Sequence, residues 1–189
     1  MQSLKQSYTT TTEVKRSKFL THIVPIEEYT GLQEKLKKEH PKANHVVYAV
    51  RFLNDYSQIV ENSSDDGEPK GCAGLPALNV LRGQEMINCA VVIVRYFGGI
   101  KLGTGGMARA YALSVKDVLA KATIIEYVKE VEFSFESSYS QVHHILYLLK
   151  ENNITNPTRL FEATTVQWHI KGSQKELEKF QEALVSIIF

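Results

Sequence analysis

The sequence predicts an α+β fold built as two domains, residues 1–127 and 128–189. Helical and strand-like patterns alternate in both parts, which is typical of mixed layered domains. The most apolar run, Ala90–Val94, is continuous and mostly β-branched, as in a strand buried on both faces. It leads into the densest glycine cluster of the chain and then into a helical pattern. A strand, a glycine loop and a helix are therefore expected at the centre of the first domain.

The first domain shows successive strand-like and helical patterns separated by turn residues. Pro25 stops the first strand, and Glu27 and Glu28 favour the first turn of a helix because they complement its dipole. Asn54 and Asp55 tolerate the positive φ of a tight hairpin turn. In order after a Thr-rich start, we expect a strand over 19–26, a helix over 27–40, strands over 44–53 and 56–60, a helix over 76–81, a strand over 90–94 and a helix over 107–122.

The second domain repeats this mixture in fewer elements. Lys129–Glu136 alternates as a strand, and Ser173 with Glu176 forms a capping box before the last helix. Trp168 is expected to pack on the layer of its own domain rather than to stack on a base. In order, we expect a strand over 129–136, a helix over 139–149, strands over 154–161 and 164–170, a helix over 173–184 and a short strand over 186–189, which is a ferredoxin-like βαββα(β) arrangement.

Composition and charge are those of an ordinary globular chain. With 43% hydrophobic and 23% charged residues there is ample core material, and the apolar runs are too short to span a bilayer. Residues 1–12 are polar, unlike a signal peptide, and Cys72 and Cys89 form neither a disulfide framework nor a zinc motif. These features predict a cytoplasmic protein. The net charge is +3 over 1–127 and −2 over 128–189, so a nucleic acid would have to meet a local basic patch.

The glycine cluster after the buried strand is the first candidate site. Five glycines fall within nine positions, where they permit positive φ and the close approach of another group. The helix that follows turns its free amides and positive dipole end toward the loop, which attracts anions. The predicted anion- or nucleic-acid-binding residues are Arg95, Gly98, Gly99, Lys101, Gly103, Thr104, Gly105, Gly106 and Arg109, with Lys15, Arg16 and Lys18 as further cations.

Two phosphate-binding motifs can be tested against this loop. Residues 98–104, GGIKLGT, have the GxxxxG frame of a P-loop but place Thr104 where its lysine belongs, which excludes a P-loop. Residues 103–108, GTGGMA, match GxGxxA but begin seven residues after Tyr96, which disfavours a dinucleotide site. The alternative is that the glycines only permit tight strand-to-helix packing and loop turns.

The acidic turn formed by Asp65, Asp66 and Glu68 is the second candidate site. Three carboxylates on a flexible turn could hold Mg²⁺ or Ca²⁺, and Arg95 and Lys101 would then clamp the phosphate of a substrate in a metal-assisted hydrolase. The surrounding turn formers favour instead a solvated or ion-paired acidic turn. In a third interpretation, Asp65 or Asp66 pairs with Arg95 or with the arginine of the following helix, so that the acidic segment orders the basic one.

Three separated motifs carry a family resemblance: SKF at 17–19, DDGEPKGCAGLP at 65–76 and VRYFGGIKLGTGGMARAY at 94–111. In this order they resemble the YigZ/IMPACT family, whose bacterial members add a small C-terminal domain. The resemblance implies a ribosomal S5 domain 2-like first domain, as in domain IV of elongation factor G, and a second domain similar to domain V of that factor. It implies regulation of translation under stress for eukaryotic relatives and no settled biochemical activity for bacterial ones.

These observations lead to one preferred function and two alternatives. We expect a non-enzymatic module that binds RNA or the ribosome through the basic glycine loop, takes part in translation regulation and needs no cofactor. The first alternative is a metal-dependent enzyme built from the acidic turn, with Mg²⁺ or another divalent cation and a phosphorylated or nucleotide substrate. The second is a regulator that acts through partner proteins. No membrane partner is expected, and the oligomeric state is left open.

Overall fold

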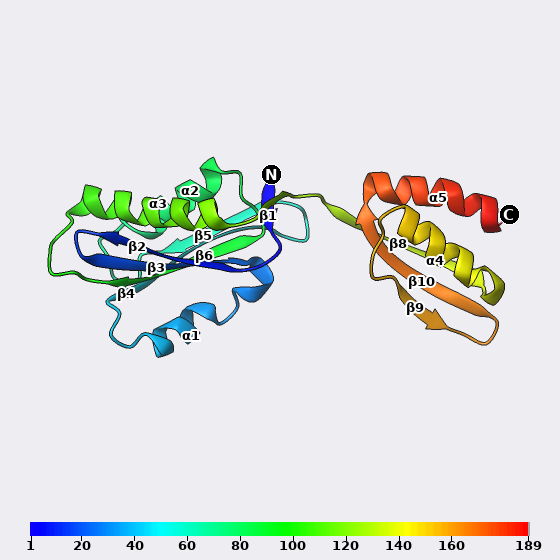
Figure 1. The fold of residues 1–189 in the computed structure, drawn as a ribbon, viewed down its shortest axis with the longest axis horizontal. Coiled ribbons are helices and arrows are strands. Elements are labelled where there is room, and N and C mark those ends of the chain that lie inside the picture. Colours follow the sequence, from blue (N-terminus) through cyan, green and yellow to red (C-terminus); the bar gives the residue numbers. More distant parts are fainter. Residues whose placement is uncertain (189) are drawn as a thin grey trace. The chain divides into compact units, whose positions relative to one another are not determined.

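The computed structural model describes residues 1–188, and its contacts divide the chain into two compact units between Tyr127 and Val128. Each unit combines an antiparallel sheet with helices (Figure 1), which confirms the α+β prediction. Among the described residues, no helix is both long and apolar enough to cross a membrane.

The first unit is built on a five-stranded antiparallel sheet whose central strand contains the apolar run. Its strands and those of a small two-stranded ladder are β1 (Gln2–Leu4), β2 (Tyr8–Val14), β3 (Ser17–Pro25), β4 (His45–Leu53), β5 (Ile59–Ser64), β6 (Cys89–Tyr96) and β7 (Ile124–Glu126). The large sheet has the order β2-β3-β6-β4-β5, and β1 pairs with β7. β6 therefore has two strands on each side, and β2 and β5 form the edges of the sheet.

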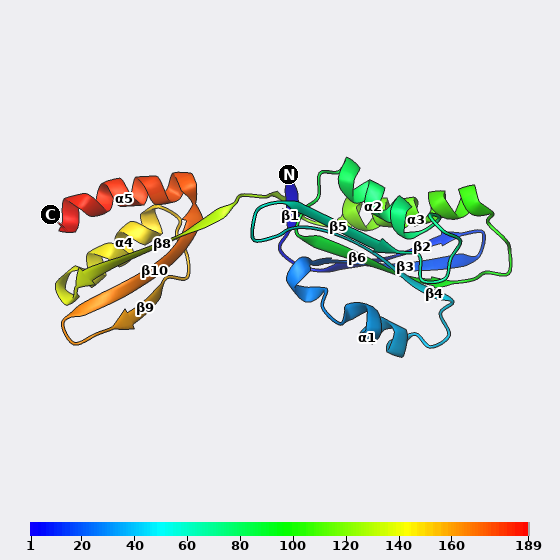
Figure 2. The same cartoon turned by 180° about the vertical axis from the view of Figure 1, so that it is seen from behind.

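Helices cover both faces of this sheet. They are η1, a 3₁₀ turn (Ile26–Glu28), α1 (Leu32–Glu39), α2 (Gly74–Gly83) and α3 (Thr104–Lys121). α2 and α3 lie on one face and α1 on the other (Figures 1 and 2). Val91 and Ile93 of β6 join the core beneath α2 and α3, whereas Val92 and Val94 join the core beneath α1. Both faces of β6 are buried, which explains why its apolar run is continuous.

The Thr-rich start, to which the sequence pattern assigned no element, forms the edge strand β2. Thr10 and Thr12 are buried, and Thr12 Oγ1 donates a hydrogen bond to Asp117 Oδ2 of α3 at 2.5 Å. β-branched threonine suits a strand, and a buried hydroxyl is tolerated when it is hydrogen-bonded. Hydrophobic alternation misses this strand because its inward-facing residues are polar.

Two helix boundaries differ from the expectation. Gly31, at φ +76°, lies directly before α1, so the helix predicted over 27–40 is divided into η1 and α1. A residue in the left-handed region interrupts a right-handed helix. α3 begins at Thr104 instead of residue 107, which places Gly105 and Gly106 in its first turn rather than in the loop.

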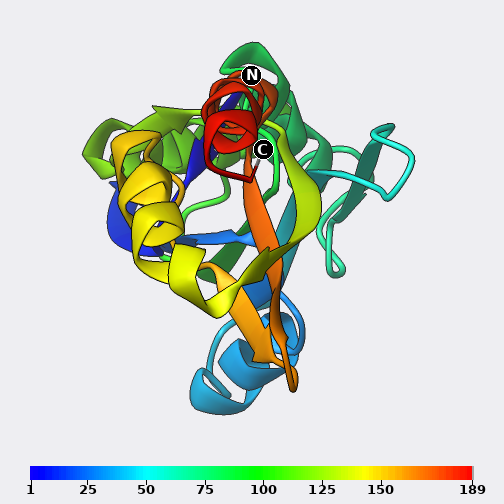
Figure 3. The ribbon, with the colours of Figure 1, turned by 90° about the vertical axis from the view of Figure 1, so that its right-hand side faces the viewer.

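The second unit contains a three-stranded antiparallel sheet in the order β8-β10-β9. Its elements are β8 (Glu130–Ser138), the 3₁₀ turn η2 (Tyr139–Gln141), α4 (Val142–Glu151), β9 (Thr158–Phe161), β10 (Thr165–Ser173) and α5 (Gln174–Ile188). α4 and α5 lie side by side against one face of this sheet (Figures 1 and 3). The observed order is the βαββα order expected from the sequence.

Two residue-level expectations in the second unit have different outcomes. Trp168 is fully buried, donates from Nε1 to Ser137 Oγ at 2.9 Å and stacks on Phe135 with 5.7 Å between ring centroids, so its expected packing role is confirmed. The short strand expected over 186–189 is wrong for Ser186–Ile188, because these residues continue α5. Phe189 lies outside the described residues.

A carboxylate on β5 ties three elements of the first unit together and predicts an acid-sensitive stability. Glu61 accepts hydrogen bonds from Arg82 of α2 at 2.6 Å and from Arg51 of β4 at 2.8 Å. The hydrogen bond from Arg82, with a further contribution from Arg51, lowers the pKa of Glu61 to about 2. The stabilisation is therefore fully present above the ordinary pKa of about 4.5 and is lost as the pH falls toward 2.

We expect Glu61→Gln to remove this dependence. Between pH 6 and pH 3, wild-type protein should lose about 1 kcal/mol more unfolding free energy than the variant, after allowance for solvent screening. Urea unfolding at the two pH values measures this difference. Glu39→Gln, which changes an exposed carboxylate on α1, is the matched control and should behave like wild type. Equal acid sensitivity in the Glu61→Gln variant would contradict the assignment.

Candidate nucleic-acid interface

The glycine loop, residues 97–103, connects β6 to α3 and leaves the start of that helix open. Gly103 precedes α3 at φ +69° and offers no side-chain oxygen as a cap. The first amide of this helix that donates to a preceding carbonyl is that of Met107, whose acceptor is the Gly103 carbonyl at 2.8 Å. The amides of residues 104–106 have no acceptor among the described residues, and Thr104 and Gly105 are exposed. Such a helix start is a site for an anion.

A second basic segment lies against this loop. Lys15 and Arg16, both at positive φ, form the turn between β2 and β3. Gly98 approaches this turn so closely that a Cβ atom on it would lie 2.0 Å from the Arg16 carbonyl carbon. The amide of Gly98 also donates to Ser17 Oγ at 3.2 Å. The absence of a side chain at Gly98 therefore lets the hairpin turn and the glycine loop lie side by side.

Four cations form what we call the basic surface: Lys15, Arg16, Lys101 and Arg109. All four side chains belong to exposed residues, and none forms an ion pair with another residue in the described part of the chain. Phe97 extends from the glycine loop with 45% of its surface exposed. The arrangement joins unpaired positive charge, free helix amides and an exposed aromatic ring.

Two of the predicted cations do not belong to this surface. Lys18 follows Ser17 on β3 and has the opposite orientation to its buried neighbour Phe19, which faces the core beneath α2 and α3. Arg95 is only 5% exposed and forms an ion pair with Glu68. The sequence predicts Arg95 among the anion-binding residues, but its guanidinium is held inside the domain and is not part of the basic surface.

The Arg95–Glu68 pair is the centre of a buried polar network. The Arg95 guanidinium carbon lies 5.6 Å from the centroid of the Phe19 ring, and the Tyr111 hydroxyl donates to Glu68 Oε1 at 2.8 Å. Burial, and then the neighbouring Glu68 carboxylate, raises the pKa of Tyr111, so its hydroxyl remains a donor. One signal in the sequence points to this burial: Arg95 is in phase with Val91 and Ile93, whose side chains face the same core.

The acidic turn does not gather its carboxylates into one site. Asp65 accepts the amides of Gly71, Ala73 and Gly74 at 2.8–3.0 Å, at the start of α2. Asp66 accepts from Lys37 Nζ at 2.5 Å and from an amide of β4 at 2.7 Å. Within residues 1–188, no group of three His, Cys, Asp or Glu side chains is placed to hold a metal ion.

The predicted cation site at Asp65, Asp66 and Glu68 is therefore not formed by these side chains. Backbone amides and basic side chains compete for each carboxylate, as expected at a turn rich in Gly and Pro. In the third interpretation, a carboxylate of the acidic turn forms an ion pair with an arginine, and the structure contains such a pair, but with a different carboxylate. The acidic segment does hold the basic one, but Glu68 pairs with Arg95, where Asp65 or Asp66 was expected.

A pocket of about 370 Å³ opens beneath the glycine loop. Glu68 and Arg95, which are buried, and His45, which is half-buried, line it, and the other lining residues are Asn44, Pro69, Phe97, Lys101, Leu102, Gly103, Thr104 and Met107. His45 Nδ1 lies 2.8 Å from the Asp66 carbonyl oxygen, which can only accept, so Nδ1 carries the proton. His45 Nε2 lies 3.7 Å from Glu68 Oε2. A smaller pocket of about 200 Å³ includes Lys15 and Arg109.

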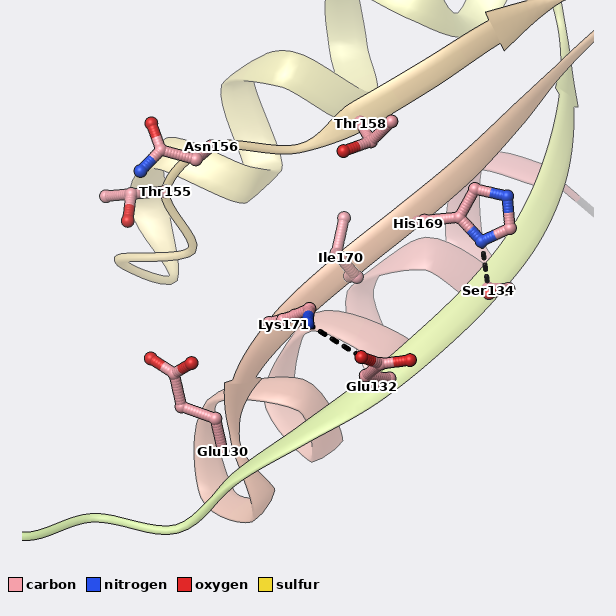
Figure 4. A pocket seen from close by; sticks show the side chains of 9 residues that line it. All are labelled: Glu130, Glu132, Ser134, Thr155, Asn156, Thr158, His169, Ile170 and Lys171. Atoms are coloured by element: carbon pink, nitrogen blue, oxygen red, sulfur yellow. Dashed lines mark hydrogen bonds and ion pairs between the residues drawn. The ribbon is translucent and has the colours of Figure 1, made fainter. Parts of the chain in front are cut away.

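The second unit contains another pocket, of about 390 Å³, on the sheet face away from its helices (Figure 4). Lys171 pairs with Glu132 at 2.7 Å, and Ser134 Oγ lies 2.8 Å from His169 Nδ1. This pairing lowers the pKa of Glu132 and raises that of Lys171. The single lysine of this pocket is already neutralised and Glu130 adds negative charge, so the pocket offers no attraction for phosphate.

Comparisons with known proteins agree with the motifs. Residues 15–119 match the family model of the Impact N-terminal domain. A protein of Haemophilus influenzae named IMPACT family member is 33% identical over 175 residues, covering 91% of this chain and 84% of the relative. IMPACT family member YvyE of Bacillus subtilis is 31% identical over 177 residues, covering 92% and 80%. A crystal structure described as that of a hypothetical protein has a TM-score of 0.67 at 29% identity and covers 98% of this chain and 91% of that one.

Proposed function

The chain belongs to the Impact N-terminal domain family, and from this premise we propose that it is a non-enzymatic module that binds RNA or the ribosome and regulates translation. The family resemblance supports the link to translation, because it implies regulation of translation for the eukaryotic members. The proposal includes the finer fold assignment, a ribosomal S5 domain 2-like first unit and a ferredoxin-like second unit, and a cytoplasmic location.

The observation that carries the proposal is the basic surface beside the open start of α3. Lys101 lies on the loop before the helix, and the Arg109 guanidinium lies 3.6 Å from where a Cβ of Gly105 would be, within the first turn. The hairpin contact at Gly98 adds Lys15 and Arg16 to the same region. Cations that have no carboxylate partner release counterions when they meet phosphates, which favours nucleic-acid binding. The exposed Phe97 ring is suited to stacking on an unpaired base.

Neither alternative has a comparable observation in its support. The carboxylates that a metal-dependent enzyme would need are held separately by amides and basic side chains. A regulator that acts through partner proteins would bind ribosomes without the steep salt dependence of phosphate contacts. The salt dependence therefore separates the proposal from this second alternative.

We expect Lys101→Gln combined with Arg109→Gln to weaken RNA binding and to flatten its salt dependence. The slope of log affinity against log salt should decrease by about 1.4, since each contact to single-stranded phosphate contributes about 0.7. Fluorescence anisotropy with a labelled single-stranded RNA, and sedimentation with ribosomal subunits, measure this across a salt series. Arg95 is left unchanged because its substitution would disturb the buried network.

The matched control is Lys38→Gln combined with Lys42→Gln. It removes the same charge from exposed positions at and just after α1, on the opposite face of the sheet. This control should keep the wild-type slope. An equal loss in both double variants would show a non-specific charge effect, and an unchanged slope in the Lys101 and Arg109 variant would overturn the proposed surface.

A further inference from the structure

The pocket beneath the glycine loop contains polar groups whose hydrogen bonds are incomplete. Arg95 Nε is buried and has no partner, although its Nη1 contacts Glu68. Glu68 Oε1 accepts from both Arg95 and Tyr111, whereas Oε2 accepts no hydrogen bond from the described residues, and His45 Nε2 lies 3.7 Å from it, beyond hydrogen-bond range. Glu68 lines the pocket, so its Oε2 is an acceptor that a ligand in the pocket can reach, whereas Arg95 Nε is enclosed by the protein.

The apolar residues that line this pocket differ in character from its buried ion pair. Phe97, Leu102 and Met107 present apolar surface, and Met107 is only 9% exposed. A thioether and an aromatic ring are favourable neighbours for a flat conjugated ring. The volume of about 370 Å³ lies within the range of small-ligand sites. A planar group that carries N–H donors on its edge would pack against these apolar side chains and reach Glu68 Oε2.

The exposed residues of the pocket favour an anion. Lys101 and Thr104 line the pocket and are exposed, and Thr104 is the first residue of α3, whose first amides have no acceptor among the described residues. α3 is 18 residues long, so its positive dipole end is fully developed. A ligand with an anionic group beside Lys101 and a flat ring with N–H donors beside Glu68 would have the chemistry of a nucleotide.

We propose that this pocket binds an unstacked nucleobase, with an N–H group of its edge donating to Glu68 Oε2 and its phosphate at Lys101 and the amides of α3. The inference rests on the proposed function and deepens it, because it assigns single-stranded RNA with a flipped base as the ligand. A free nucleotide presents the same chemistry, so the test includes both sources. Insertion of the base between Phe97 and Met107 would provide the stacking that phosphate contacts lack.

The test uses the full chain and a labelled uridine octamer beside an octamer of the same length with abasic positions. We expect the abasic RNA to bind about 5- to 100-fold more weakly at equal salt, the range that corresponds to the loss of base stacking. Phe97→Ala should abolish most of this difference. Ile100→Ala is the matched control, since Ile100 is similarly exposed on the same loop but does not line the pocket, and it should keep the difference.

Photo-crosslinking locates the base independently of any substitution. An octamer with a single 4-thiouridine should form an adduct within the peptide that contains Met107, which an RNA bound only to the outer surface would not reach. Competition by uridine monophosphate would show that a free nucleotide also occupies the pocket, and its absence would assign the site to RNA.

The two levels of the proposal fail in different ways. Abasic and normal RNA that bind equally, with the full salt slope retained, would overturn the base pocket and leave the RNA-binding function standing. Adducts confined to the hairpin turn would have the same meaning. No binding of either RNA at low salt would overturn the function itself.

Discussion

Replacing Glu68 with alanine is expected to lower the free energy of unfolding of the first unit by about 3 to 5 kcal/mol. The substitution leaves the Arg95 guanidinium, whose side chain is 6% exposed, without its carboxylate partner. It also removes the acceptor of the buried Tyr111 hydroxyl. An unpaired buried charge is among the few single changes with so large an effect. Urea unfolding followed by far-ultraviolet circular dichroism measures the change.

Three comparisons make this result specific. Glu39→Ala removes an exposed carboxylate that pairs with Lys35 at 3.8 Å, and it should change stability by less than about 1 kcal/mol. Glu68→Leu combined with Arg95→Met replaces the pair with apolar side chains and should recover much of the loss. The fluorescence of Trp168, the only tryptophan, reports on the second unit and should keep its midpoint. A loss below about 1 kcal/mol for Glu68→Ala would contradict the buried pair.

Gly98→Ala is expected to separate the glycine loop from the β2–β3 hairpin. The added Cβ would lie 2.0 Å from the Arg16 carbonyl carbon and 2.3 Å from the Ser17 amide nitrogen. Both are backbone atoms, so no side-chain rotation relieves the overlap. Overpacking of this kind typically destabilises by about 1 to 3 kcal/mol. RNA binding should weaken as well, because Lys15 and Arg16 move away from the loop.

The matched control is Gly83→Ala at the end of α2, where an added Cβ would have nothing within 4 Å. This change should be neutral or stabilise by up to about 1 kcal/mol, since alanine is the better helix former. Urea unfolding and the RNA salt series are measured for both variants. If Gly98→Ala keeps wild-type stability and salt slope, the loop and the hairpin do not depend on this contact.

Local pattern in the sequence determined the element types and the family. Hydrophobic periodicity predicted the strands β3, β4 and β6 and the helix after the glycine loop, because alternation and helical spacing are properties of neighbouring residues. The continuous run Ala90–Val94 predicted a strand buried on both faces, and the structure confirms it. The three motifs indicated the family to which the chain belongs. The glycines also predicted an open helix start, although α3 begins earlier than expected.

The tertiary structure alone decided which charges are free. In the sequence, Arg95 and Lys101 are both basic residues beside the glycine cluster. In the structure, Arg95 is buried against Glu68, 27 residues away, whereas Lys101 is exposed. The contact between Gly98 and Arg16 joins segments about 80 residues apart and brings a second pair of cations to the site. Such partners depend on strand order and register, which bring distant segments together, and a one-residue shift would turn each side chain to the other face. A sequence pattern shows which residues carry charge, whereas the fold determines which of those charges remain available to a ligand.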